Sequence, residues 1–285
     1  MEDTRCIKNK RFGLDDEMNK EERHPLPAPM RERVLEELAR LERECDVSVL
    51  YACESGSRAW GFASPDSDYD VRFVYVARPE WYLRVDEPHD VIERPLSDEL
   101  DVSGWELRKA LRLLRKSNPT LLEWLDSPLV YRSEERTTAE LRRLAETFYC
   151  PRATRQHYLS MAKKNFRGYL QGEEVRYKKY LYVLRPLLAV HWIDQGRGRP
   201  PMAFHALLAT LDDPVLLAEI DESLALKRQA AETAYGPRRQ ALHAFIEKQL
   251  ARAGQDSAPA RPDQDVALLD RFLRETVLAH AGEQP

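Results

Sequence analysis

The chain has 285 residues, of which 43% are hydrophobic, enough to build one large core or two modest ones. Its 44 basic and 48 acidic side chains leave a net charge of only −4, so any contact with nucleic acid must come from a local basic surface. The four cysteines include no Cys-x-x-Cys pair, which argues against zinc ribbons and dense disulfide frameworks. The N-terminus lacks an apolar signal core, and the most apolar stretch, 181–193, falls short of the roughly 20 residues that span a bilayer. We therefore expect a cytoplasmic protein without a membrane partner.

The front of the chain predicts a mixture of helices and strands. Residues 1–29 are charged and end in a proline-rich run, which is typical of a disordered leader. Apolar residues at three- and four-residue intervals predict an amphipathic helix over 30–44. Two β-prone runs, 47–53 and 69–76, then predict the two main strands.

Two further short strands are expected over 90–92 and 99–102, on either side of a turn. A helix should follow, with Ser103 as its N-cap, and should stop at Asn118-Pro119. The tryptophans of this region, Trp105 and Trp124, lie among leucines at helical spacing and are expected to be core residues.

From residue 121 onwards the sequence shows almost no strand-like alternation. Helical patterns are predicted at 134–147, 152–171, 175–194, 203–210, 213–233 and 236–252. A linker, 253–262, precedes a C-terminal helix within 263–285. The predicted fold is therefore α+β: a small mixed sheet with flanking helices over 30–140, followed by an all-helical domain over 141–252.

Two aspartates separated by one residue carry the chemical signal. Asp68 and Asp70 lie at the start of the second main strand, where side chains two residues apart point to the same face. Like charges at this spacing repel one another unless cations lie between them. Oxygen ligands suit Mg²⁺ or Mn²⁺ better than zinc, and Mg²⁺ sites commonly combine one or two carboxylates with substrate phosphates.

A Gly-Ser turn lies upstream of this pair. Gly56 and Ser57 follow the first main strand, and their backbone N–H groups and the Ser57 hydroxyl predict an anion cradle at the start of a short helix. Gly56 allows close backbone approach, and Arg58 adds a charged donor. Ten residues separate Ser57 from Asp68, which lets the chain re-enter the sheet on the neighbouring strand and brings the turn and the carboxylates together.

These features resemble the polymerase-β-like nucleotidyltransferase superfamily, and within it the YcgL-type, or RNA-repair-pathway (RNA-ligase-associated), nucleotidyltransferases. The resemblance covers about residues 47–210. It rests on Glu54-Ser55-Gly56-Ser57-Arg58-Ala59-Trp60-Gly61-Phe62, Asp66-Ser67-Asp68-Tyr69-Asp70-Val71-Arg72-Phe73, Asp101-Val102-Ser103-Gly104-Trp105, Asn118-Pro119 with Glu123-Trp124-Leu125, and Lys178-Lys179-Tyr180-Leu181-Tyr182-Val183-Leu184-Arg185-Pro186.

The resemblance implies a metal site and its ligands. Three carboxylates, Asp68, Asp70 and Asp101, are expected to hold two Mg²⁺ or Mn²⁺ ions, and the third to help deprotonate the attacking hydroxyl. Asp101 has rivals nearby, because Glu99 shares its strand face and Asp98 and Asp90 are close in sequence. Glu54 is interpreted as a structural partner of Arg58 or Arg72 rather than as a ligand.

The back half supplies positive charge. Nine lysines or arginines against two glutamates lie between 152 and 185. Lys178, Tyr182 and Arg185 share one helix face and are expected, with Gly56, Ser57 and Arg58, to bind the nucleotide. The groups predicted to extend the positive surface toward RNA are Arg155, Lys163, Lys164, Asn165 and Arg167, with Tyr158 and Tyr169 for stacking. A merely solvated basic face explains the same pattern.

The sequence therefore predicts a metal-dependent enzyme that transfers a nucleoside monophosphate from a nucleoside triphosphate to a hydroxyl. RNA is the favoured acceptor, and the resemblance implies an RNA ligase of the same pathway as a partner. Two alternatives stay open: transfer to a protein or small-molecule hydroxyl, and a catalytically silent nucleotide-binding regulator. The sequence does not specify the base of the nucleotide.

Overall fold

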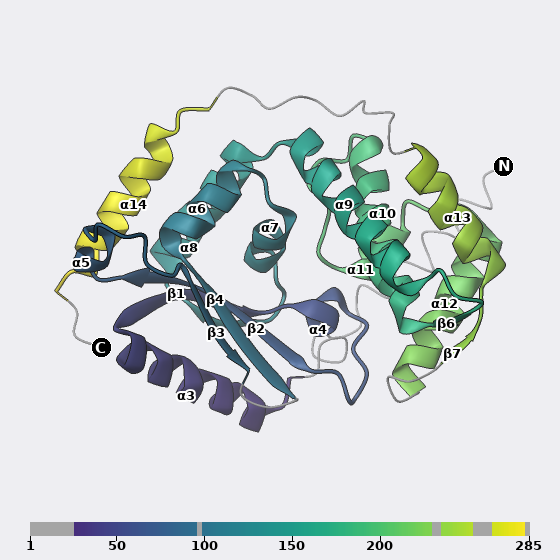
Figure 1. Cartoon of the computed structure of the whole chain (residues 1–285), viewed down its shortest axis with the longest axis horizontal. Coiled ribbons are helices and arrows are strands. Elements are labelled where there is room, and N and C mark those ends of the chain that lie inside the picture. Colours follow the sequence, from purple (N-terminus) through teal and green to yellow (C-terminus); the bar gives the residue numbers. More distant parts are fainter. Residues whose placement is uncertain (1–25, 96–98, 230–234, 253–263, 283–285) are drawn as a thin grey trace, which may run out of the picture.

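A five-stranded mixed sheet forms the centre of the front half (Figure 1). In the computed structural model, which describes residues 26–95, 99–229, 235–252 and 264–282, the strand order is β3-β4-β2-β1-β5. The bounds are β1 Val47–Glu54, β2 Tyr69–Ala77, β3 Val91–Pro95, β4 Leu100–Glu106 and β5 Val130–Ser133. Strands β2 and β4 are parallel, and the other neighbours pair antiparallel. The predicted α+β class is confirmed.

Helices cover both faces of this sheet and continue into the back half. Those of the front half are α3 Ala28–Cys45, α4 Gly56–Trp60, α5 Pro79–Tyr82, α6 Leu107–Arg115, α7 Pro119–Leu125 and α8 Glu135–Phe148. Those of the back half are α9 Pro151–Tyr169, α10 Lys178–Asp194, α11 Phe204–Leu208, α12 Pro214–Gln229, α13 Gln240–Ala251 and α14 Ala267–Ala279. A small ribbon of β6 Glu174–Arg176 and β7 Tyr235–Pro237 lies among them.

Most of the predicted elements are confirmed, but one helix start was wrong and several short elements, among them α5 and α7, were missed. Ser103 is not a helix cap, because β4 continues through Glu106, whose carboxylate accepts hydrogen bonds from the first backbone N–H groups of α6. Strand β5 was missed because it is only four residues long and pairs with the edge of β1. The predicted helices 175–194 and 236–252 begin too early, because residues 174–176 and 235–237 form the β6–β7 ribbon, so the domain expected to be all-helical contains a short two-stranded sheet. The leader through residue 25, Asp98 and the linker 253–262 lie outside the described residues.

Each face of the sheet has its own core because side chains alternate along the strands. Val71 and Phe73 of β2 pack with α3, whose apolar stripe includes Val34 and Leu38. Val74 and Val76, on the opposite face of β2, pack with α6, α7 and α8. Trp105 and Trp124 belong to this second core, with ring centroids 3.9 Å apart, as their leucine-rich surroundings predict.

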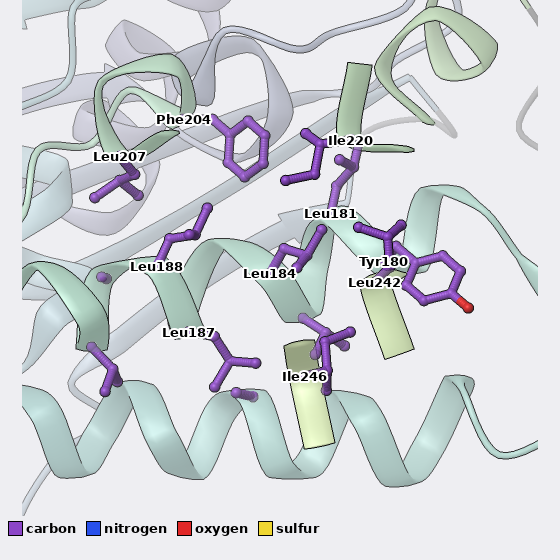
Figure 2. Packing of buried hydrophobic residues seen from close by; sticks show 14 of the residues in the cluster. Tyr180, Leu181, Leu184, Leu187, Leu188, Phe204, Leu207, Ile220, Leu242 and Ile246 are labelled. Carbon is purple, nitrogen blue, oxygen red and sulfur yellow. The ribbon is translucent and has the colours of Figure 1, made fainter. Parts of the chain in front are cut away.

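A third core holds the back half together. Helix α10 lies at its centre and packs against α9, α11, α12 and α13. Figure 2 shows its aliphatic side chains, among them Leu184 and Leu188, meeting Phe204, Ile220 and Ile246 from three other helices. Pro186 lies inside α10, but the helix runs on to Asp194.

The last helix returns to the front half. Helix α14 packs against α6 and β2, away from α12 and α13 that precede it in the sequence (Figure 1). Leu269, Phe272 and Val277 join the core of the sheet, and Arg78 Nη1 donates a hydrogen bond to the carbonyl of His280 (2.9 Å). The C-terminal helix predicted within 263–285 therefore packs as part of the sheet unit.

The described ranges contain neither a membrane-spanning helix nor a disulfide-bonded cysteine. None of the helices in those ranges is long and apolar enough to cross a membrane. Cys45, Cys53 and Cys150 are free thiols, as the absence of a Cys-x-x-Cys pair led us to expect.

Candidate active site

Gly56, at the start of α4, is in direct contact with Asp70 of β2. Gly56 has a φ of +61°, a left-handed conformation that glycine adopts at little cost. A Cβ at this position would lie 2.0 Å from Asp70 Oδ2, so any side chain here would collide with the carboxylate. The backbone N–H of Ser55 also donates to the carbonyl of Asp70 (2.8 Å). The predicted meeting of the Gly-Ser turn with the carboxylate strand is thus present.

Asp70 and Asp101 are neighbours across the parallel pair β2–β4. They are paired in register, and adjacent strands lie about 4.8 Å apart. Arg72 bridges them: its Nη2 donates to Asp70 Oδ1 (3.1 Å) and to Asp101 Oδ2 (2.6 Å). Asp101 therefore reaches the site, whereas its rival Asp90 accepts from Lys109 Nζ (2.8 Å). Glu99, the other described rival, lies 3.8 Å from an Arg33 guanidinium nitrogen.

Asp68 lies just before β2 and is exposed. It is close enough to Asp70 for its negative charge to raise the pKa of that carboxyl. Across the described ranges, no three histidine, cysteine or acidic side chains lie close enough together to form a metal cage. The site consists instead of two carboxylates that share one guanidinium, with a third carboxylate beside them.

The charge balance of this cluster is visible in Asp70. Burial raises the pKa of Asp70, the positive charge of Arg72 lowers it, and the charges of Asp101 and Asp68 raise it again. The carboxylate is thus in a setting where additional positive charge would be favourable. The donors are oxygens only, as hard divalent cations prefer, so these residues fit Mg²⁺ or Mn²⁺ in chemical type.

Glu54, the last residue of β1, supports the site through hydrogen bonds. Its Oε1 accepts from the backbone N–H of Asp70 (2.8 Å), and its Oε2 accepts from the Tyr131 hydroxyl (2.5 Å). Burial raises the pKa of Glu54 to about 7, against the lowering effect of these two hydrogen bonds. The structural role expected for Glu54 agrees with this placement, but its hydrogen-bond partners are Tyr131 and the Asp70 backbone rather than Arg58 or Arg72.

Arg58 and Ser57 lie beneath the surface of the turn. Ser57 is 6% exposed and Arg58 is 4% exposed. Arg58 donates to the carbonyls of Asp68 (3.2 Å) and Ser67 (2.5 Å), and its guanidinium carbon lies 3.8 Å from the ring centre of Tyr69. These contacts hold the segment that carries Asp68 against α4.

Helix α10 meets α4 through aromatic and cationic contacts. Tyr182 lies edge-on to Trp60 with ring centroids 5.7 Å apart, and the Arg185 guanidinium carbon lies 4.6 Å from the centre of the Trp60 ring. Lys178 lies one helical turn before Tyr182 on the same helix face. The predicted face of α10 is therefore turned toward the helix that begins at Gly56.

Arg185 is nevertheless buried, at 2% exposure, and engaged by the protein. Its Nη1 pairs with Glu123 Oε1 (2.8 Å), and its Nη2 donates to the carbonyl of Met202 (3.0 Å). Glu123 also accepts from the Tyr158 hydroxyl (2.6 Å). The guanidinium predicted to meet the triphosphate thus ties α10 to α7 and to Trp60 of α4 in this structure.

The expected RNA surface divides into a buried and an exposed part. Arg155 and Tyr158 are buried, and Arg155 pairs with Asp194 (2.6 Å), so neither belongs to an outer surface. Those two expectations were wrong because both residues lie on the core side of α9. Lys163, Lys164 and Arg167 are exposed on the opposite side and line a hollow with Ser160 and Gly168.

Two more features extend from this surface toward α10. Tyr169 is 48% exposed, and the Lys179 ammonium lies 4.0 Å from its ring centre and 5.2 Å from that of Tyr182. Asn165 Nδ2 donates to the carbonyl of Tyr182 (3.1 Å). Tyr169 and Asn165 of α9 thus contact Lys179 and Tyr182 of α10, and Tyr182 in turn contacts Trp60 of α4.

Sequence reasoning missed two residues of the site. Arg72 lies two positions after Asp70, so the period-two rule that paired Asp68 with Asp70 could have placed it on the same face. Tyr131 carried no comparable signal, because strand β5 was not recognised and its partner Glu54 lies 77 residues away.

Comparisons with known proteins agree with the motifs. The sequence profile of the RNA repair pathway DNA polymerase beta family (RlaP) matches residues 30–275. The chain is 46% identical over 251 residues to the protein YcgL of Bacillus subtilis (strain 168), covering 87% of this chain and 96% of that protein. A solved nucleotidyltransferase-like protein from Exiguobacterium sibiricum 255-15 is 14% identical, with a TM-score of 0.28 over 87% of this chain and 77% of that chain. The resemblance drawn from the motifs is thus confirmed, and the chain belongs to the RNA repair pathway DNA polymerase beta family.

Proposed function

We propose that the protein transfers a nucleoside monophosphate from a nucleoside triphosphate to an acceptor hydroxyl, and that RNA is the acceptor. The observation that carries this proposal is the contact of Asp70 with the Gly56 turn on one side and its in-register pairing with Asp101 on the other. This juxtaposition offers carboxylate oxygens next to a turn without a Cβ. The missing Cβ lets the Asp70 carboxylate lie against the turn, so oxygen ligands for divalent ions would stand next to the backbone groups proposed to bind the phosphates.

Asp68, Asp70 and Asp101 are the residues that would hold the divalent ions. When bound, Mg²⁺ or Mn²⁺ supplies positive charge that stabilises the entering and leaving oxygens of an in-line displacement. Gly56 and Ser57 would bind the phosphates. Arg58 positions the segment of Asp68, and Lys178 and Tyr182 of α10 are proposed to face the nucleotide. Arg185 supports the same region from the core, where it contacts Trp60 and pairs with Glu123.

The chemistry is a substitution at the α-phosphorus. The acceptor hydroxyl oxygen forms a bond to this phosphorus, the bond to the oxygen bridging the α- and β-phosphorus atoms breaks, and pyrophosphate leaves with the bond's electron pair. The hydroxyl proton passes to a carboxylate, and we assign this role to Asp101, whose side chain is 46% exposed. The protein otherwise contributes mainly position and charge.

RNA is favoured as the acceptor by family membership and by the α9 surface. Lys163, Lys164 and Arg167 offer charge for phosphates. Tyr169 offers an exposed ring on which a base can stack, next to Lys179. Lys179 also lies 5.2 Å from the Tyr182 ring, and Tyr182 contacts Trp60 in the helix that begins at Gly56, which supports an RNA path from Tyr169 toward the proposed reaction site.

A transfer assay tests this function. Each of the four α-labelled nucleoside triphosphates is supplied with Mg²⁺ or Mn²⁺ and with RNA, DNA, cell extract or no acceptor. We expect label on RNA with the wild-type protein and a loss of at least about 10³-fold with Asp70→Asn, because that substitution removes a carboxylate from the reaction centre. Asp86→Asn, an exposed aspartate in the loop after α5, is the matched control and should retain activity.

The acceptor arms separate the alternatives. Label on protein or on a small molecule in the extract, with none on RNA, would replace RNA as the acceptor. If no transfer occurs with any acceptor but the protein binds a nucleotide, the result would favour the catalytically silent regulator. Activity in Asp70→Asn equal to wild type would refute the site itself, provided circular dichroism shows both proteins to be folded.

A further inference from the structure

Arg72 occupies the space between the two carboxylates that the proposed function assigns to metal. Its Nη2 contacts Asp70 Oδ1 at 3.1 Å and Asp101 Oδ2 at 2.6 Å, and its Nη1 donates to the carbonyls of Val71 (3.0 Å) and Asp101 (3.2 Å). Four hydrogen bonds therefore hold one guanidinium, which is only 19% exposed. A side chain with this many hydrogen bonds has a fixed position in the site, unlike a mobile arginine on the surface.

The fold makes this bridge possible. Asp70 and Arg72 are two residues apart on β2 and share one strand face, while Asp101 lies opposite Asp70 on β4. Arg72 therefore reaches its neighbour along the strand and a diagonal partner across the parallel pair. No segment from the back half is needed for the contact.

The guanidinium compensates a concentrated negative charge. Asp70, Asp101 and Asp68 lie close enough that the charges of the other two carboxylates each raise the pKa of Asp70, whereas Arg72 lowers it. A divalent ion held by Asp70 and Asp101 would bind carboxylates that Arg72 already contacts, and it would place two positive charges near a third. The guanidinium and a metal ion would therefore compete to neutralise the same carboxylates.

We propose that Arg72 is a built-in counter-ion that holds Asp70 and Asp101 together in the metal-free protein and competes with the divalent ion for them. This inference rests on the proposed function insofar as that function assigns metal to these carboxylates. It predicts two opposite effects of Arg72. The side chain stabilises the protein when no divalent ion is bound, and it weakens the affinity of the site for that ion. An arginine that merely oriented the ligands would do the opposite to affinity.

The test is isothermal titration of the purified full chain with Mn²⁺ alone, in wild type, Arg72→Gln and Arg72→Lys. We expect Arg72→Gln to bind Mn²⁺ about tenfold more tightly, because a competing positive charge is gone. In EDTA the same variant should unfold at a temperature lower by roughly 2–4 °C, because two carboxylates lose their shared partner. Arg72→Lys keeps the charge and should stay near the wild-type affinity.

Arg94→Gln is the matched control. Arg94 lies on the neighbouring strand β3 and pairs with Glu44 (2.5 Å) on the α3 side, so its loss removes one positive charge without touching Asp70 or Asp101. Its Mn²⁺ affinity should equal that of wild type. Weaker or unchanged Mn²⁺ binding by Arg72→Gln, with wild type binding normally, would overturn this inference alone. No Mn²⁺ binding by any of the four proteins would overturn both the inference and the metal part of the proposed function.

Discussion

The residues of the site depend on one another through backbone as well as side-chain groups. Glu54 accepts from the N–H of Asp70 and from Tyr131, so the backbone that carries the carboxylate is anchored by a nearly inaccessible acid. Arg72 holds the same carboxylate from the solvent side. Asp70 is thus fixed between a buried acid and a guanidinium, which limits the geometries it can adopt.

Glu54 gives the fold a pH dependence that can be measured. Its folded pKa of about 7 lies above the ordinary value of 4.5, so the folded state binds the proton more tightly than the unfolded state does. The stability that Glu54 contributes is therefore fully present below about pH 4.5 and is lost as pH rises through about 7. The shift corresponds to a loss of up to about 3 kcal/mol.

We expect Glu54→Gln, which cannot ionise, to lack this loss. Urea unfolding in EDTA from about pH 4.5 to about pH 8 should show the stability of wild type falling relative to that of the variant. Both proteins keep every other titrating group, so their difference isolates Glu54. Parallel stability curves would contradict a raised pKa at this position.

Helix α9 shows how one element divides its residues between two tasks. Tyr158 and Arg155 face inward and make buried polar contacts, whereas Lys163, Lys164 and Arg167 face outward. The helical period of 3.6 residues produces this division, and counting charges along the sequence conceals it. Only the outward set can meet RNA phosphates.

If that outward face binds RNA, neutralising two of its lysines should have a defined effect. We expect Lys163→Gln with Lys164→Gln to weaken binding of a single-stranded RNA and to reduce the slope of log affinity against log salt by about 1.4, or about 0.7 for each lost phosphate contact. Fluorescence anisotropy at several salt concentrations measures both quantities. The control is Arg115→Gln with Lys116→Gln, two exposed neighbours at the C-terminal end of α6, and it should leave the slope unchanged. An unaltered slope in the Lys163 and Lys164 variant would exclude this face from RNA binding.

At the scale of the whole molecule, segments late in the sequence pack against segments that come much earlier. Helix α10 reaches back to α4 through Trp60, and α14 reaches back to the sheet through Phe272. The buried pair of Arg185 and Glu123 joins α10 to α7 at the same boundary. The two halves of the chain therefore meet at the proposed site, and the C-terminal helix braces the sheet that carries it.

The docking of α14 can be tested by Phe272→Ala. Phe272 is 7% exposed in the core shared with α6 and the sheet, so its truncation should cost about 3 kcal/mol of unfolding free energy. Hydrogen exchange should quicken in α6 and β2 and stay slow in α10. Leu278→Ala on the same helix, where the side chain is 64% exposed, should change little. Faster exchange confined to α10 would assign α14 to the other half.

Much of this protein was open to prediction because its signals are local. The Gly-Ser turn, the aspartates of β2 and the helical periodicity of the back half are all read within short windows, and the structure confirms the strands and helices they predict. The end of β4 was misjudged because Trp105 and Leu107 fit a helical spacing as well as a strand end. Strand β5 could not be predicted, because a four-residue edge strand is defined by its pairing with β1 rather than by a pattern in its own sequence.

By itself, the amino-acid sequence determined the family and most of the order of helices and strands, and it indicated the carboxylates around which the proposed site is built, since these signals lie in short motifs. The tertiary structure alone decided that Arg72 bridges Asp70 and Asp101, that Tyr131 meets Glu54, and that Arg185 is buried against Glu123. Those contacts join residues 29 to 77 positions apart or depend on which neighbours cover a side chain. Burial and partnership of this kind arise only when distant segments pack together, because a local pattern fixes which face a side chain occupies but not what lies opposite it.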